Sequence, residues 1–189
     1  MTEQQPSSSA RDANRTPAHI AFQREPASTR SELVVTSPQL RAGATIPPRH
    51  TAYGEGISPA LRWNQVDGAR SYVLLVEDPD APTPQPFVHW LAWNIPSGVH
   101  GLPEGIPQTA GPEIEGMCQG LNGRGQAGYF GPRPPRGDGA HHYHFQVFAL
   151  DRMLGLPVDA DRDDALAAMN GHVLAKGQLV ATSEAPAAA

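Results

Sequence analysis

Three segments of the chain have the hydrophobic pattern of strong β-strands. Residues 71–77, Ser-Tyr-Val-Leu-Leu-Val-Glu, are aromatic, β-branched or aliphatic almost throughout, which is typical of a central strand covered on both faces. Residues 87–95 and 141–150 are similar in length and contain polar residues at intervals. Because alternate strand residues point to opposite faces, each of these two segments predicts which of its side chains lie together.

The two alternating segments therefore make specific predictions. In residues 87–95 one face is expected to carry Phe87, His89, Leu91 and Trp93, and the other Val88, Trp90 and Ala92. In residues 141–150 one face is expected to carry His141, Tyr143, Phe145 and Val147, and the other His142, His144, Gln146 and Phe148. This parity separates His141 from His144.

Weaker patterns predict the remaining elements. Residues 33–36 form a short strand, and residues 57–63 form an edge strand because Pro59 cannot donate to a sheet ladder. Residues 96–127 are rich in glycine and proline and predict a long connection of the functional or mobile kind. An amphipathic helix begins at the N-cap Asp161 and continues through Leu174, and it closes the domain.

The two ends of the chain lack the apolar content of the middle. Residues 1–31 predict a disordered N-terminal tail, residues 32–182 one domain, and residues 183–189 a frayed C-terminal tail. The first residues do not have the apolar core of a signal peptide, so a cytoplasmic location is expected. No apolar run approaches the roughly 20 residues that a transmembrane helix needs.

Composition narrows the class of protein further. Twenty prolines and nineteen glycines among 189 residues favour a β-rich fold with many turns. The net charge of −5 and the scattered arginines argue against a nucleic-acid partner. The single cysteine, Cys118, cannot form an intramolecular disulfide, which fits a reducing cytosol.

Two proline-rich motifs at predicted strand ends carry the candidate chemistry. Asp78-Pro79-Asp80-Ala81-Pro82 is followed by His89, and the loop of residues 128–135 is followed by His141 and Tyr143. Contact between Asp78 and His89 would fix the histidine tautomer and raise its pKa, which favours an anion. Glycines 131, 137 and 139 would let backbone N–H groups approach that ligand.

Each feature also has another explanation. Asp-Pro-Asp is a common turn former, a histidine among aromatic residues is often a core residue, and the proline-rich loop is able to serve as a docking segment. His142 and His144 share a face and suit a metal, but no motif supplies a third ligand. Cys118 has no basic neighbour that would activate it, and no Gly-x-Ser-x-Gly elbow is present.

These motifs resemble those of the phosphatidylethanolamine-binding proteins, in particular the bacterial Raf kinase inhibitor-like branch. The similarity covers residues 33–180 and includes the two motifs above, His89-Trp90, and Gly171-His172-Val173-Leu174-Ala175. The resemblance implies a mainly β fold of two packed antiparallel sheets, with a C-terminal α-helix, short peripheral helices and a small anion pocket. It implies that the ligand-binding residues are Asp78, His89, Pro134, His141 and Tyr143, supported by Trp90, Asp80, Pro82, Gly131, Pro132 and Arg133.

The resemblance also bears on function. It implies a binding protein for phosphate, phosphoethanolamine or a similar small anion, with no cofactor or metal, and it raises the prospect of a kinase or protease partner and of a homodimer. The main alternative is an isomerase or hydrolase that uses the same Asp, His and Tyr groups for proton transfer. Arg133 stands where bacterial relatives often have cysteine, and we expect it to face solvent. Within the Asp-Pro-Asp motif, Asp78 is the pocket residue and Asp80 the residue that stabilises the turn.

Overall fold

In the described residues, two antiparallel sheets and two short α-helices make up the fold. The computed structural model describes residues 19–111 and 114–187. Its elements are, in chain order, α1 (Ala21–Arg24), β1 (Val35–Thr36), the 3₁₀ turn η3 (Pro48–His50), β2 (Leu61–Trp63), β3 (Ser71–Asp78), β4 (Phe87–Pro96), β5 (Gly101–Leu102), β6 (Cys118–Gln119), β7 (His141–Leu150), α2 (Arg162–Met169) and β8 (Val173–Ser183).

The larger sheet has the strand order β6-β4-β3-β7-β8, and the smaller sheet has the order β1-β2-β5. Neighbouring strands in both sheets are antiparallel. β3 lies in the middle of the larger sheet, and each of its residues is buried, as the apolar run predicted. The expected mainly β fold with two antiparallel sheets is confirmed.

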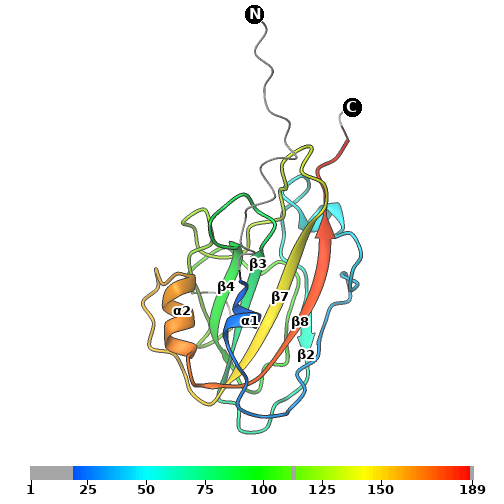
Figure 1. Cartoon of the computed structure of the whole chain (residues 1–189). Coiled ribbons are helices and arrows are strands. Elements are labelled where there is room, and N and C mark those ends of the chain that lie inside the picture. Colours follow the sequence, from blue (N-terminus) through cyan, green and yellow to red (C-terminus); the bar gives the residue numbers. More distant parts are fainter. Residues whose placement is uncertain (1–18, 112–113, 188–189) are drawn as a thin grey trace, which may run out of the picture.

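Alternate residues of β3 belong to two separate apolar clusters. Tyr72, Leu74 and Val76 face the smaller sheet, where they pack with residues such as Trp63. Val73 and Leu75 face the opposite way and pack with residues of α1 and α2, which lie over the outer face of the larger sheet (Figure 1). The domain thus has three layers: the smaller sheet, the larger sheet, and the two helices.

A β-bulge in β4 changes the predicted facing of its side chains. Val76 pairs with Trp90, whereas Glu77 pairs with Val88, so His89 is the extra residue. Trp90 and Ala92 pack toward the smaller sheet, and Val88, Leu91 and Trp93 pack toward the helices. The prediction that His89 shares a face with Leu91 and Trp93 is therefore wrong. Strict alternation does hold in β7, where Tyr143, Phe145 and Val147 share one face.

The C-terminal region also differs from the prediction. Asp161 caps α2 as expected, because its carboxylate accepts hydrogen bonds from the N–H groups of Asp163 and Asp164. The helix ends at Met169, however, and Gly171 has a φ of 78°, which is a left-handed conformation. Residues 173–183 form strand β8, so the domain closes with a strand and the frayed tail begins later than residue 183.

The edge-strand prediction for residues 57–63 is wrong in its position. β2 begins at Leu61, after Pro59, and lies between β1 and β5 in the middle of the smaller sheet. The proline therefore lies outside the ladder and does not prevent pairing on both sides. The connection over residues 96–127 is largely irregular, as expected, and includes the two-residue strands β5 and β6.

Part of the predicted N-terminal tail packs against the domain. Residues 19–31 were expected to be a disordered tail, but Ile20 and Ala21 are buried and α1 packs on the outer face of the larger sheet. Burial of these two side chains, together with polar contacts to the sheet, provides the stabilisation that composition did not reveal. The rest of the predicted tail, residues 1–18, lies outside the described residues.

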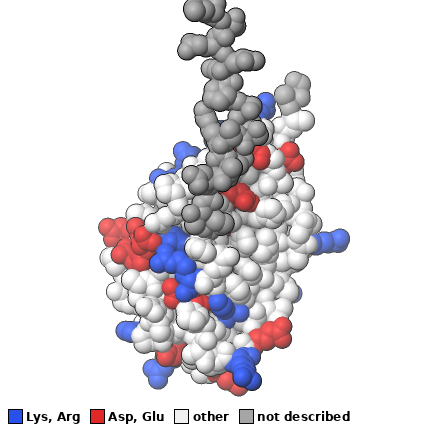
Figure 2. Space-filling view, viewed as in Figure 1, with Lys and Arg blue, Asp and Glu red and all other residues white. Residues whose placement is uncertain are grey.

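On the face that carries α1, the described residues form no broad basic surface (Figure 2). Acidic and basic side chains are interspersed there, with uncharged surface between them (Figure 2). Among the helices in the described ranges, none is long and apolar enough to cross a bilayer.

Candidate functional site

A cavity of about 530 Å³ opens beside the ends of β3, β4 and β7. Much of the predicted site lies in its wall, namely Asp78, Pro82, His89, Arg133, Pro134, His141 and Tyr143. The wall also includes residues that the motifs did not single out as site residues, among them Phe87, Arg124 and Phe130. Trp90, Asp80, Gly131 and Pro132, which were expected to support the pocket, are not wall residues.

Asp78 contacts a different histidine from the one expected. Its Oδ2 atom lies 2.8 Å from His141 Nδ1, and both side chains are almost fully buried. Its Oδ1 atom accepts hydrogen bonds from the N–H groups of Asp80 and Ala81, so Asp78 itself stabilises the turn. Burial raises the pKa of Asp78, and the hydrogen bond from His141 partly offsets this increase.

His89 is held by the loop that forms the opposite wall. Its Nδ1 lies 2.7 Å from the carbonyl oxygen of Phe130, and the Phe130 N–H donates to the His89 carbonyl oxygen. Because a carbonyl only accepts, Nδ1 carries the proton and Nε2 of the neutral ring is an acceptor. Burial lowers the pKa of His89 to about 4, despite the hydrogen bond to Phe130, which acts in the other direction. The expected Asp78–His89 contact and raised histidine pKa are therefore wrong.

Tyr143 provides a buried hydroxyl group in the cavity wall. Its side chain meets the ring of His89 edge to face, with 5.0 Å between the centroids. The hydroxyl makes no hydrogen bond of regular geometry within the described residues. Burial and the nearby Asp78 carboxylate raise the pKa of Tyr143, which keeps the hydroxyl protonated and able to donate.

Two arginines lie in the cavity wall and are exposed to solvent. Arg133 belongs to the proline-rich loop, and Arg124 lies over the ring of Phe130 at 5.0 Å from its centroid. The Asn122 side chain accepts a hydrogen bond from the Arg124 N–H and so shapes the turn that presents this residue. Arg133 was expected to face solvent. It is exposed, as expected, and it also lines the cavity. The sequence contained no motif that marked Arg124.

Gly131 fixes the proline-rich wall from behind. A Cβ atom at this position would lie 2.6 Å from the Ala52 nitrogen and 2.7 Å from the Thr51 carbonyl carbon, so only glycine fits. The Ala52 N–H also donates to the carbonyl oxygen of Pro132, and the Tyr53 hydroxyl donates to that of Pro134. Gly131 therefore serves close backbone packing. Gly131 does not line the cavity, and the expected approach of its N–H group to a ligand stays a prediction.

We expect Gly131→Ala to lower the free energy of unfolding by about 1–3 kcal/mol, because the added methyl group meets backbone that cannot move without displacing the wall. Urea denaturation measures the change. Gly98→Ala is the matched control, since its new Cβ would meet no atom within 4 Å, and it should alter stability by less than about 1 kcal/mol. Equal effects of the two substitutions would contradict this role of Gly131.

The other predicted support residues have structural contacts. Asp80 Oδ2 accepts hydrogen bonds from the N–H group and Nδ1 of His142, and so ties the turn to β7. Trp90 is fully buried in the core and donates to Gln119 Oε1 at 2.6 Å. His144 Nδ1 lies 3.0 Å from Gln178 Oε1. Over the described ranges, no three His, Cys, Asp or Glu side chains are grouped so that they could hold a metal ion.

Fold and cavity agree with a family-level assignment. A family model described as phosphatidylethanolamine-binding protein matches residues 36–184. The chain therefore belongs to the phosphatidylethanolamine-binding protein family, and the family resemblance of the motifs is confirmed.

Relatives are found in bacteria and archaea. A UPF0098 protein of Pyrococcus abyssi is 44% identical over 157 residues, which are 81% of this chain and 86% of the relative. The crystal structure of YbcL from Escherichia coli, described as a member of the mammalian PEBP family, superposes with a TM-score of 0.76 at 33% identity and covers 82% of this chain and all of YbcL. The PEBP homologue CT736 of Chlamydia trachomatis has a TM-score of 0.74 at 35% identity, with 82% of this chain and 99% of that protein covered.

Proposed function

We propose that the cavity binds a small anionic group such as phosphate or the phosphoethanolamine headgroup. The observation that carries this proposal is the convergence of Asp78, His141 and Tyr143 in the wall of one open cavity. The Tyr143 hydroxyl, which interacts with the Asp78 carboxylate, stays protonated and supplies a hydrogen-bond donor at this wall. His141 lies beside it in the same wall and offers a second hydrogen-bonding group.

The positions of the charged side chains favour an anion that enters the cavity from its solvent-exposed side. Arg124 and Arg133 are exposed wall residues, and their positive charge attracts anions toward the cavity. The Asp78 carboxylate within the wall opposes a high negative charge there, which favours a singly charged or protonated phosphate over the dianion. A protonated phosphate oxygen is also able to donate to the acceptor Nε2 of neutral His89.

The size and apolar walls of the cavity support a ligand larger than inorganic phosphate. Phe87 and Phe130 flank His89, with their rings 4.9 Å and 5.7 Å from its ring centroid. Together with Pro82 and Pro134 they form an apolar wall beside the polar groups. A headgroup that joins an anionic end to a short organic chain suits such a mixed lining.

Two neighbouring histidines of β7 provide the test. We expect His141→Gln to weaken phosphoethanolamine binding by about tenfold or more, because a hydrogen bond to a charged group contributes about 1.5–3 kcal/mol. His142→Gln should change it by less than about twofold, because His142 is exposed and its ion pair with Asp80 lies outside the cavity wall. Isothermal titration calorimetry at pH 7 measures both affinities. No heat with the unsubstituted protein, or equal losses in the two variants, would contradict the proposal.

We favour binding over proton-transfer catalysis because of how Asp78 is held. One of its oxygens accepts two backbone hydrogen bonds and the other contacts His141. Both oxygens therefore already have partners, and neither is free to accept a proton from a substrate. Regulation of a kinase or protease and formation of a homodimer are further proposals that rest on the family resemblance. Co-purification and native mass spectrometry of the full chain test them.

A further inference from the structure

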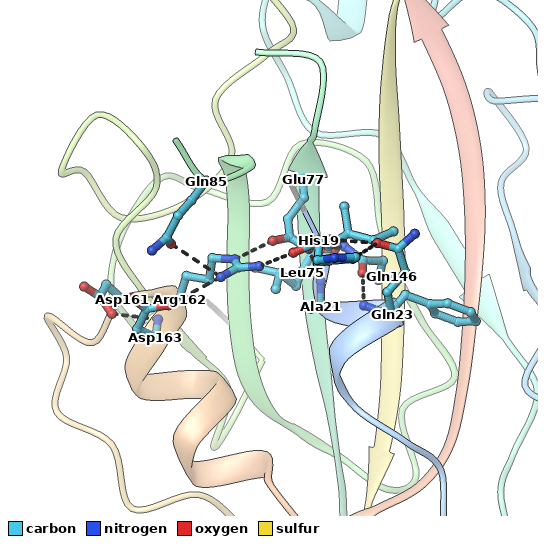
Figure 3. A network of polar contacts seen from close by, with 12 residues as sticks. His19, Ala21, Gln23, Leu75, Glu77, Gln85, Gln146, Asp161, Arg162 and Asp163 are labelled. Atoms are coloured by element: carbon cyan, nitrogen blue, oxygen red, sulfur yellow. Dashed lines mark hydrogen bonds and ion pairs between the residues drawn. The ribbon is translucent and has the colours of Figure 1, made fainter. Parts of the chain in front are cut away.

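A buried charged cluster lies on the opposite side of β3 from the cavity. Glu77, which directly precedes Asp78, is fully buried, and Arg162 of α2 is 5% exposed. Arg162 Nε donates to Glu77 Oε1 at 2.5 Å, and Gln146 Nε2 of β7 donates to Glu77 Oε2 at 2.7 Å (Figure 3). These side chains come from three separate elements and point toward one another on the outer face of the larger sheet.

The cluster binds the backbone of the N-terminal segment, residues 19–25. The Ala21 N–H donates to Glu77 Oε2 at 2.7 Å, and the Phe22 N–H donates to Gln146 Oε1 at 2.6 Å. Arg162 Nη2 donates to the His19 carbonyl oxygen at 3.0 Å (Figure 3). Farther along the segment, Lys176 of β8 donates to the carbonyl oxygens of Phe22 and Glu25. Side chains of the domain thus pair with successive main-chain groups, which is how proteins recognise peptides.

The domain side chains that contact the segment also contact each other. Arg162 and Gln146 both donate to Glu77, so each of the three side chains keeps a polar partner when the segment leaves. The segment itself has only a four-residue helix, which is too short to be stable alone. The large side chain of Phe22 is only partly buried and lies over Lys176 at 4.4 Å. The segment is therefore a small element on a preformed surface.

We propose that the surface formed by Glu77, Gln146, Arg162 and Lys176 is a peptide-binding site, and that residues 19–25 occupy it as a detachable intramolecular ligand. The chemical class of ligand is a short peptide that is bound through its main chain and carries a small apolar residue at the position of Ala21. Ala21 is fully buried among the apolar residues of the outer-face cluster, so a long or charged side chain does not fit there.

The connection to the rest of the chain keeps this site occupied. The N–H groups of Ser28 and Thr29 donate to the carbonyl oxygens of Val173 and Leu174, which holds the segment close to the start of β8. A tethered segment binds at a high effective concentration, so a free peptide competes poorly until the segment is detached. The site is distinct from the cavity, and its test does not depend on phosphate binding.

Hydrogen exchange of the unaltered full chain tests whether the segment detaches. We expect the amides of Ala21 and Phe22 to exchange at least about tenfold faster than those of Leu75 and Val76 in β3, after correction for intrinsic rates, because they open without global unfolding. Opening of all four amides at one common rate would overturn the proposal, since the segment would then leave only when the whole domain unfolds.

Peptide binding tests whether the surface recognises the segment as a ligand. In the full-length Ala21→Arg variant the segment should be displaced, and fluorescence anisotropy should detect saturable binding of a labelled peptide of residues 19–27. Affinity should fall at least about tenfold for a peptide with the same Ala21→Arg change, and also when Lys176→Met is added to the protein. The unaltered protein, whose site is occupied, should bind the peptide at least about tenfold more weakly.

Circular dichroism with a cooperative thermal transition first establishes that these variants fold. If they fold and the peptide binds none of them, or binds all of them and the unaltered protein equally, the proposal is overturned. If the Ala21→Arg variant does not fold, the hydrogen-exchange result on the unaltered chain decides the question.

Discussion

Arg162→Ala is expected to lower the free energy of unfolding by about 3–5 kcal/mol. Glu77 is fully buried, and the substitution removes its only cationic hydrogen-bond partner among the described residues, leaving Gln146 and the Ala21 N–H. A buried carboxylate without a compensating charge is costly because the low-dielectric interior does not replace its hydration. Urea denaturation at pH 7, followed by far-ultraviolet circular dichroism, measures this loss.

Arg152→Ala is the matched control for Arg162→Ala. Arg152 is exposed, and among the described residues its side chain is hydrogen-bonded to His172 and the Met153 carbonyl oxygen, so stability should change by no more than about 0.5 kcal/mol. The double variant Glu77→Gln, Arg162→Met should recover at least half of the loss, since no unpaired charge is then buried. A loss below about 1 kcal/mol for Arg162→Ala would show that Glu77 does not depend on this partner.

The second large effect concerns acid stability and His89. Burial lowers the pKa of this side chain in the folded protein to about 4, whereas its ordinary value is 6.5. At pH values between these two pKa values, His89 binds a proton in the unfolded chain but not in the folded protein, so acidification favours unfolding. At about 1.4 kcal/mol per pKa unit, His89 should reduce the free energy of unfolding by about 3 kcal/mol between pH 7 and pH 4.

Comparison of two variants separates His89 from the other titrating groups. Burial raises the pKa of Asp78, which acts in the opposite direction because the folded protein then takes up a proton first as the pH falls. Urea denaturation over a series of pH values should show an acid loss about 3 kcal/mol smaller in His89→Leu than in the unsubstituted protein. His142→Gln, which changes an exposed histidine, should retain the full loss. Identical pH dependence in His89→Leu and the unsubstituted protein would contradict a buried, neutral His89.

Most of the predicted site residues line one cavity because they lie where strands end and turns begin. Alternation in β7 correctly placed Tyr143 on the opposite face from His144, since that strand pairs without a bulge along this stretch. The Asp78 motif was correctly associated with the cavity wall. Its histidine partner was not, because His141 follows Asp78 by 63 residues and only the pairing of β3 with β7 brings them together.

The other wrong predictions also depend on strand pairing or on turns formed in the folded protein. The bulge at His89 depends on how β3 and β4 pair, and the sequence of β4 contains no signal that predicts it. The helix prediction ran past Met169 because Val173 and Leu174 happen to continue a helical spacing, whereas tertiary pairing with β7 makes them strand residues. Arg124 has no motif of its own and reaches the cavity wall only through a turn that Asn122 shapes.

The amino-acid sequence by itself determined the β-rich class, the central position of residues 71–77, and the family, because apolar runs and long motifs are local properties of the chain. Tertiary structure alone decided the Asp78–His141 pair, the neutral state of His89, and the docking of residues 19–25 on Glu77 and Arg162. Each of these depends on burial and on contacts between distant segments. Burial sets the cost of charge, and strand register sets which groups meet, so neither follows from the order of residues along the chain.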